Sequence, residues 1–248
     1  MKIALITGGQ PRFTPDFITL LSQIQGMESA DIYMNLWNSD WAKDEDEARK
    51  KVEKILPPNF KLARIKLTDQ PPYELPPHTR SLPPPEPENI QWWYKRKIGQ
   101  MQSLSMAFNL IDQEYDAVIR FRLDGRLDRV INVNEFDLIN NDIIMPQPRV
   151  GREDFPICDQ FFIGTYSGVK FFCDLVNDFK KYVVLSDPDW DDNTHHGVWS
   201  LEHIIGAYYL TNNKQVGAGG FNTYINTQGR SRYTDKHYHH GITPDPTS

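Results

Sequence analysis

The first 66 residues alternate between short apolar runs and amphipathic segments, and this alternation restricts the fold more than any other feature of the sequence. Residues 2–7, 30–37 and 60–66 have the length and pattern of β-strands. Between these runs, residues 16–25 and 43–56 carry apolar side chains at helical spacing. A β-α-β-α-β order is typical of a parallel sheet whose strands are joined by helical crossovers.

Further elements of both kinds follow in the rest of the chain. We expect the longest helix at residues 90–113, where a single apolar stripe continues at helical spacing. The other expected elements are strands at residues 142–145 and 159–164 and helices at residues 167–182 and 201–210. The sequence therefore predicts a Rossmann-like α/β protein, with a mixed, mostly parallel central sheet flanked by helices.

A proline-rich stretch, PPYELPPHTRSLPPPEPE, interrupts this pattern at residues 71–88. Proline has no amide hydrogen to donate and its φ angle is fixed, so we expect neither a helix nor a central strand here. The stretch is an irregular excursion bordering a site, a linker between two halves or, as an alternative, a PxxP ligand for another domain.

The charge, cysteine content and hydropathy of the chain exclude several classes of protein. A net charge of −6 over 248 residues argues against a nucleic-acid-binding protein with a broad basic surface. The two cysteines, Cys158 and Cys173, are too few for a disulfide scaffold. No apolar run approaches the ~18 residues that a membrane span needs, and Gly8-Gly9 stands where a signal-peptide core would continue. We expect a cytoplasmic protein.

Residues 115–128, YDAVIRFRLDGRLD, carry the most informative polar pattern in the chain. We expect a strand in which Arg120, Arg122 and Asp124 share one face while apolar side chains occupy the other. Ligands of α/β sheets bind just beyond the carboxyl ends of the strands, so this face would hold an anion and a metal ion. The alternative is an ion-pair network that caps the sheet.

Three other segments contain candidate ligands. In the loop after the first expected strand, Gly8 permits close approach of a ligand to the backbone, and Arg12 can bind a phosphate bidentately. The alternative for this loop is a surface turn with a solvated arginine. Lys95, in the first turns of the longest helix, is either a solvated charge or a phosphate ligand. Glu202 is either placed favourably against a helix macrodipole or is a carboxylate base facing the site.

Several short motifs occur in a fixed order along the chain. They are TGGQPR, DIYMNLW, an aromatic and basic helix beginning at Trp92, YDAVIRFRLD, CDQFFIG and WSLEHIIGAYYL. In this order they resemble GT-A-like glycosyltransferases from bacterial, phage and large-virus surface-polysaccharide gene sets. The resemblance spans nearly the whole chain and implies a single GT-A-like domain over residues 1–248. Its parts would be a nucleotide-binding half at 1–66, a proline-rich excursion at 67–89 and an acceptor-side half at 90–248.

The resemblance also implies roles for individual residues. Asp124 would replace the first carboxylate of the D-x-D motif, Asp159 and Gln160 would face the transferred sugar or the acceptor, and Glu202 would be the candidate base. The expected donor-binding residues are Gly8, Gln10, Arg12, Lys95, Arg120, Arg122, Asp124 and Gln160.

The D-x-D motif itself is absent, because the chain reads Asp124-Gly125-Arg126 and the next carboxylate is Asp128. One possibility is that Asp124 and a tail histidine such as His237 bind a divalent cation, Mn²⁺ or Mg²⁺. The other is that Arg122 and Arg126 neutralise the diphosphate without a metal ion.

These features predict a glycosyltransferase with two partners, a nucleotide-sugar donor and a glycan or other hydroxyl acceptor. The departing diphosphate needs a cation or arginines, and an inverting transfer needs a base, for which Glu202 and Asp159 are the candidates. A nucleotidyltransferase is an alternative, although it would normally have a lysine in the phosphate loop, which GGQPR lacks. A catalytically degenerate nucleotide-sugar-binding protein is another alternative.

Overall fold

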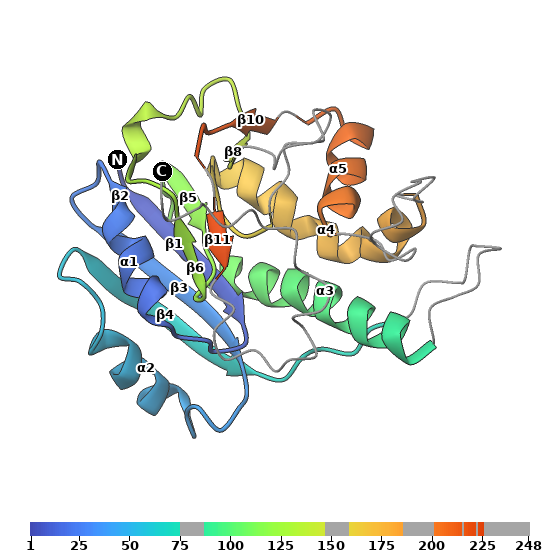
Figure 1. Cartoon of the computed structure of the whole chain (residues 1–248), viewed down its shortest axis with the longest axis horizontal. Helices are drawn as coiled ribbons and strands as arrows, with labels where there is room; N and C mark the ends of the chain where they lie inside the picture. The colour runs from blue at the N-terminus through green and yellow to red at the C-terminus, as the bar shows by residue number, and fades with distance from the viewer. Residues whose placement is uncertain (75–86, 147–158, 186–200, 215, 222, 226–248) are drawn as a thin grey trace, which may run out of the picture.

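A seven-stranded sheet with helices on both faces forms the centre of the protein (Figure 1). The computed structural model describes residues 1–74, 87–146, 159–185, 201–214, 216–221 and 223–225. In spatial order the sheet contains β10 (Val216–Ala218), β8 (Ile143–Met145), β9 (Phe162–Gly164), β5 (Ala117–Arg120), β1 (Ile3–Gly9), β3 (Ala30–Trp37) and β4 (Phe60–Thr68).

The sheet is mixed and mostly parallel. β5, β1, β3 and β4 are parallel neighbours, and β10 is parallel to β8, whereas β9 is antiparallel to both β5 and β8. The predicted α/β class with a mostly parallel sheet is therefore confirmed. Two small two-stranded sheets accompany it. They pair β2 (Ile24–Gln25) with β7 (Ile131–Asn132) and β6 (Gly125–Leu127) with β11 (Thr223–Ile225), and a short 3₁₀ helix, η1 (Val133–Glu135), follows β7.

The helices bury two separate apolar layers, one on each face of the sheet. The helices α1 (Pro15–Gln23) and α2 (Glu45–Glu53) pack on one face through residues such as Phe17, Leu21 and Val52. On the other face lie α3 (Pro87–Phe108), α4 (Tyr166–Leu185) and α5 (Leu201–Thr211), which bury residues such as Met101 and Phe172 (Figure 1). Side chains alternate between the two layers along β1 and β5, as the period of two predicts.

Local sequence signals account for several helix ends. Proline occupies the first turn of α1, where its missing amide hydrogen would have no partner in the helix. At α2, the N-cap Asp44 accepts a hydrogen bond from the amide of Glu47 at 2.8 Å, and Lys50 and Lys51 stand in the last turn, where cations interact favourably with the helix dipole.

Several predicted boundaries are wrong. The helix expected at residues 16–25 ends at Gln23, and Ile24–Gln25 form the strand β2. The longest helix spans Pro87–Phe108 rather than 90–113, so the end of the proline-rich stretch is helical, because proline is tolerated in a first helical turn. β5 stops at Arg120, and the following residues form an extended segment and a turn before β6. β9 begins at Phe162, so Asp159 and Gln160 precede the strand instead of opening it.

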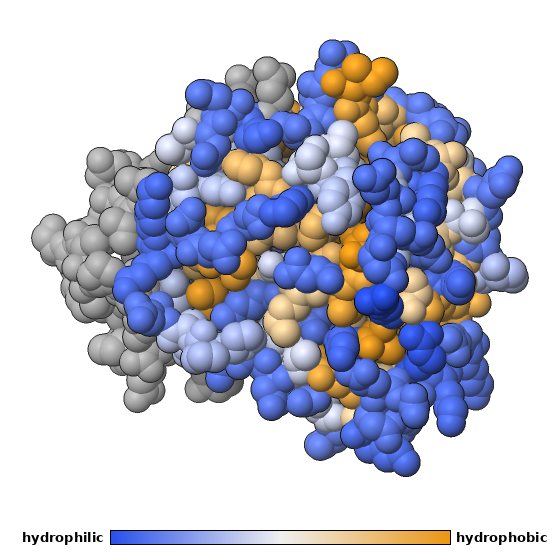
Figure 2. Space-filling model, turned by 180° about the vertical axis from the view of Figure 1, so that it is seen from behind, coloured by the Kyte–Doolittle hydropathy of each residue, from blue (hydrophilic) through white to orange (hydrophobic). Residues whose placement is uncertain are grey.

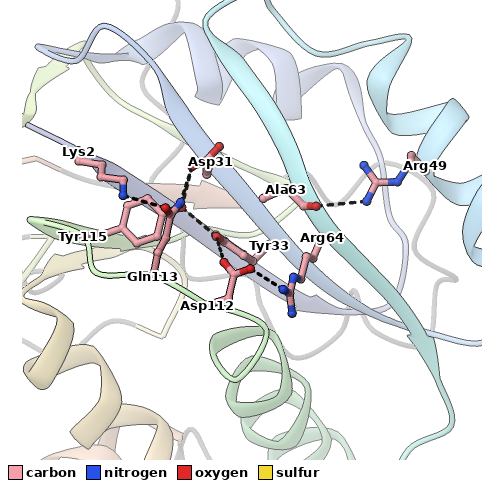
Figure 3. Close-up of polar contacts among 9 residues, drawn as sticks. All are labelled: Lys2, Asp31, Tyr33, Arg49, Ala63, Arg64, Asp112, Gln113 and Tyr115. Atoms are coloured by element: carbon pink, nitrogen blue, oxygen red, sulfur yellow. Dashed lines mark hydrogen bonds and ion pairs between the residues drawn. The ribbon is translucent and has the colours of Figure 1, made fainter.

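A polar network joins the amino ends of the strands to the segment after α3 (Figure 3). The hydroxyl of Tyr115 donates to Asp31 Oδ2 at 2.6 Å, accepts from Gln113 and lies 2.8 Å from the hydroxyl of Tyr33. Lys2 donates to Gln113 Oε1 at 2.9 Å. Burial, together with the hydrogen bond to Asp31, raises the pKa of Tyr115 well above its ordinary value.

The same network reaches the edge strand β4. Asp112 Oδ1 accepts from the hydroxyl of Tyr33 at 3.2 Å, and Asp112 Oδ2 accepts from Arg64 on β4 (Figure 3). Lys2 adds a further tie, because its backbone amide donates to Asp116 Oδ2 at 2.6 Å. The segment between α3 and β5 is thus held to β1, β3 and β4 at once.

Seen from behind, hydrophilic residues dominate the described part of the face, with apolar residues between them (Figure 2). The most exposed large apolar residue among those described is Ile139, at 95% exposure. None of the described helices combines the length and the apolar character that a membrane crossing requires.

Two buried tyrosines offer a matched test of this network. We expect Tyr115→Phe to lower the free energy of unfolding by about 1–3 kcal/mol, because Asp31, Tyr33 and Gln113 each lose a hydrogen bond to the hydroxyl. Tyr209→Phe should be neutral or stabilising, because the Tyr209 hydroxyl is buried without a hydrogen-bond partner among the described residues. Urea denaturation of both variants measures the difference, and equal effects would contradict the assignment.

Candidate functional site

The carboxyl ends of β1 and β5 meet where the order of the strands reverses. β1 leads through α1 to β3 on one side, whereas β5, which follows α3, lies on the other side of β1. Open α/β sheets bind their ligands in the crevice outside such a switch point. The loop that contains Gln10 and Arg12 and the segment that contains Arg122 and Asp124 both begin at this edge.

Close packing of α3 on β1 explains one glycine of the first loop. A Cβ added to Gly8 would lie 2.6 Å from the carbonyl oxygen of Ser103 in α3, so no larger residue fits without moving the helix. Gly9 has a φ of 106°, a conformation that favours glycine. The sequence suggested that Gly8 lets a ligand approach the backbone, but it did not reveal this packing role, which brings α3 close to the strand ends. The predicted donor-binding role of Gly8 stays a prediction.

Asp124 is held by two arginines at the turn after β5. Its two carboxylate oxygens accept hydrogen bonds from Nε and Nη2 of Arg122, both at 2.8 Å, and Arg12 Nη1 lies 3.9 Å from Oδ2. Asp124 is only 4% exposed, whereas the side chain of Arg12 is 45% exposed. The hydroxyl of Thr14 donates to the carbonyl of Leu123 at 3.4 Å, which ties the turn to the first loop.

Arg120 differs from the other arginines because it is buried. It is the last residue of β5, it is 1% exposed, and its guanidinium donates to the carbonyl of Phe121. Its neighbours Phe121 and Leu123 are buried in the core, so the predicted alternation continues beyond the end of the strand. The three polar residues of the pattern therefore lie at one edge, but only Arg122 and Asp124 reach beyond the strand.

Asp159 is the second buried carboxylate of the site. It is 5% exposed, and one of its oxygens accepts a hydrogen bond from Gln100 of α3. Burial on its own raises the pKa of Asp159, but the positive charges of Lys97, Arg122 and Arg120 and the hydrogen bond from Gln100 outweigh burial and leave the pKa below its ordinary value. Asp159 is thus an ionised carboxylate inside a cationic cluster.

The structure brings five of the predicted site residues together: Arg12, Arg120, Arg122, Asp124 and Asp159. Together with Lys97 and Gln100 we call them the arginine–aspartate cluster. Sequence reasoning did not assign Lys97 or Gln100 to the site. They are three residues apart in α3 and so lie on one helical face. This polar pair beside the apolar stripe is the sequence feature from which their place in the site could have been predicted.

The remaining predicted residues are less closely tied to the cluster. Gln10 is exposed, Gln160 is partly buried next to Asp159, and Lys95 is exposed on α3, where its carbonyl accepts from Gln70 at 3.0 Å. Glu202 lies in the first turn of α5, but its side chain is outside the described residues. His237 and the tail around it also lie outside them.

Two surface hollows lie elsewhere on the molecule. One of about 780 Å³ is beside the amino ends of β1 and β3, and one of about 450 Å³ is beside β8 and β10. Each of these hollows is lined by one lysine or arginine side chain, Lys2 or Arg129, and neither includes a member of the arginine–aspartate cluster. We place the candidate site at the cluster, because charged groups with shifted pKa values often mark functional sites and open α/β sheets bind ligands at the switch point.

No protein-family model matches this chain, and no curated protein matches it. The assignment of a function therefore depends on the geometry and charges of the cluster. Within the described ranges, no three His, Cys, Asp or Glu side chains gather closely enough to hold a metal ion.

The pKa of Asp159 gives a testable dependence of stability on pH. A carboxylate with a lowered pKa in the folded state stabilises the fold above its unfolded pKa of about 3.9, and this stabilisation is lost as the pH falls through the folded pKa. We expect Asp159→Asn to lower the free energy of unfolding by about 3 kcal/mol at pH 7, because Lys97 and the arginines lose their counter-charge.

Urea denaturation between pH 7 and pH 2.5 measures this difference. The difference in the free energy of unfolding between the wild type and Asp159→Asn should become smaller below about pH 4. The exposed Asp40→Asn is the control and should change stability by no more than about 0.5 kcal/mol at any pH. A gap that stays constant across the whole pH range would contradict an ionised Asp159.

Proposed function

We propose that this protein is a GT-A-like glycosyltransferase that moves a sugar from a nucleotide-diphosphate sugar to a glycan or other hydroxyl acceptor. The observation that carries the proposal is the arginine–aspartate cluster at the carboxyl ends of β1 and β5. Guanidinium groups bind phosphate oxygens bidentately, and the switch point of an α/β sheet is a common position for a nucleotide. The order of the sequence motifs supports the same reading.

The residues of the cluster suit the charge that develops in such a reaction. When the bond to the anomeric carbon breaks, negative charge accumulates on the departing diphosphate, and fixed cations lower the energy of this state. Arg12, the most exposed of the three clustered arginines, would contact the diphosphate first. Asp124 orients Arg122 through two hydrogen bonds, so the guanidinium is ordered before the donor arrives.

A divalent cation remains part of the proposal as an alternative source of positive charge. Asp124 is the described carboxylate that would hold it, and Mn²⁺ or Mg²⁺ bound there would supply Lewis-acid stabilisation of the leaving diphosphate. Both oxygens of Asp124 already accept hydrogen bonds from Arg122, which favours neutralisation by arginine. The ligand experiment below separates the two possibilities.

The base for an inverting transfer is proposed at Glu202. Lys214 follows α5 by three residues and forms an ion pair at 3.3 Å with Asp142, the residue before β8. The last turn of α5 is therefore close to the amino ends of β8 and β10. Glu202 is in the first turn of α5 and therefore lies at the opposite end of the helix, about 14 Å along the helix axis from Thr211 in the last turn.

A thermal-shift screen of nucleoside diphosphates and nucleotide sugars, each with and without Mn²⁺, tests the proposed function. A ligand that binds only the folded state raises apparent stability, by about 2.7 kcal/mol at a hundredfold excess over Kd. We expect one base class to stabilise the protein, and its sugar to be transferred or hydrolysed on prolonged incubation. Binding without turnover would favour the degenerate binding protein, and no shift with any compound would overturn the proposal.

Replacing Asp124 tests the site itself. We expect Asp124→Ala to reduce turnover roughly a hundredfold or more, because Arg122 loses the carboxylate that orients it and any metal ion loses its ligand. The matched control is Asp128→Ala, an exposed carboxylate four residues further along the chain. Full activity in an Asp124→Ala protein with a native circular-dichroism spectrum would rule out the site.

Replacing Arg12 tests the phosphate contact. We expect Arg12→Ala to weaken binding of the stabilising nucleoside diphosphate about tenfold or more, since hydrogen bonds to charged groups contribute about 1.5–3 kcal/mol. Binding of the parent nucleoside should change little. Arg64→Ala, which removes an arginine from the edge strand β4, is the control for a general loss of positive charge. Titration calorimetry measures the affinities of the wild type and both variants for the two ligands, and equal losses in both variants would contradict a specific contact.

A further inference from the structure

Asp159 is surrounded in a way that is unusual for a proton acceptor. It is 5% exposed and is enclosed by groups from two parts of the chain. From α3 come the hydrogen bond of Gln100 and the positive charge of Lys97, and from the end of β5 and the segment after it come the charges of Arg120 and Arg122. An acceptor hydroxyl must come within hydrogen-bond distance of its base, and this carboxylate presents almost no surface to such a group.

The electrostatics of Asp159 also differ from those of an efficient base. A general base works best when its pKa is near the working pH, whereas the surrounding cations lower the pKa of Asp159. A buried guanidinium such as Arg120 has the opposite requirement, because it needs a nearby anion to offset its lost hydration. Asp159 supplies such an anion, because the charges of Arg120 and Asp159 stabilise each other.

We propose that Asp159 is a positioning residue that anchors Arg120, Arg122 and Lys97 for the donor diphosphate, and that it does not accept the proton in sugar transfer. Gln100 completes the anchor, because its hydrogen bond fixes the carboxylate against α3. This inference rests on the proposed function for the identity of the ligand, but the anchoring itself is a property of the ligand-free protein. It leaves the proton to another group, of which Glu202 is the candidate in α5.

The sign of one binding change distinguishes an anchor from a base. Removing a negative charge beside an anion site strengthens anion binding if the cations stay in place. If the cations depend on that charge for their positions, binding weakens instead. We therefore expect Asp159→Asn to bind inorganic pyrophosphate about tenfold more weakly than the wild type, because the donors no longer converge.

A second variant covers the possibility that Asp159→Asn fails to fold. Gln100→Met removes the hydrogen bond but keeps a side chain of similar length, and we expect it to weaken pyrophosphate binding in the same direction by a smaller factor. Asp128→Asn, an exposed carboxylate near the turn, is the matched control and should leave pyrophosphate binding unchanged.

Nuclear magnetic resonance of the arginine side chains reports the anchor without any ligand. We expect the Nη–Hη signals of the Arg120 guanidinium to be sharp and slow to exchange in the wild type and in Asp128→Asn, and to broaden or exchange rapidly in Asp159→Asn. These signals would identify Asp159 as an anchor even if the wild type bound no pyrophosphate. That result would contradict the proposed function but not the anchoring of Arg120 by Asp159.

The opposite pattern would overturn the inference alone. If the wild type binds pyrophosphate, and Asp159→Asn keeps the Arg120 signal and binds pyrophosphate as tightly or more tightly, the carboxylate is not an anchor. A loss of turnover in that variant would then assign the proton transfer to Asp159.

Discussion

A guanidinium group inside a folded protein is stable only if an anion lies close to it, and Arg120 imposes this requirement on the site. The residue ends β5 at 1% exposure, so its charge has lost most of its hydration. The penalty for burying an unpaired charge is several kcal/mol, and the ionised Asp159, in the segment just before β9, offsets it. Three elements, β5, β9 and α3, are therefore coupled through one buried carboxylate.

The helix α3 connects the two edges of the sheet. At the carboxyl edge it supplies Gln100 and Lys97, and it approaches β1 closely enough that Gly8 has no room for a side chain. At the amino edge the segment that follows α3 is fastened to β1, β3 and β4 through Tyr115 and Asp112 (Figure 3). A site held between packed elements in this way keeps its donors in place without a ligand, which is what binding a phosphate in a defined geometry requires.

The carboxylates of the cluster hold cations in place, a role that a sequence pattern does not distinguish from that of a base or a metal ligand. Carboxylates at a candidate site are readily taken for bases or metal ligands, yet both described carboxylates of the cluster are engaged with arginine or lysine. Asp124 orients Arg122, and Asp159 balances the deeper Arg120. The site is thus organised as a set of fixed cations, and the reaction we propose makes its largest electrostatic demand on such a set when the diphosphate departs.

The sequence by itself determined the class of the fold and the edge of the sheet at which the candidate site lies. Periodicity is a local property, so the helices and strands of the first 66 residues, and the shared face of Arg120, Arg122 and Asp124, follow from residue order. Tertiary structure alone decided that Arg120 is buried, that Asp159, in the segment before the antiparallel strand β9, lies near it, and that Lys97 and Gln100 of α3 complete the cluster. These interactions join Asp159 to residues 37 to 62 positions away in the chain, and no periodic pattern specifies which distant charge will offset a buried one. The same reason explains why a carboxylate that looks like a base in the sequence becomes a counter-ion in the folded protein.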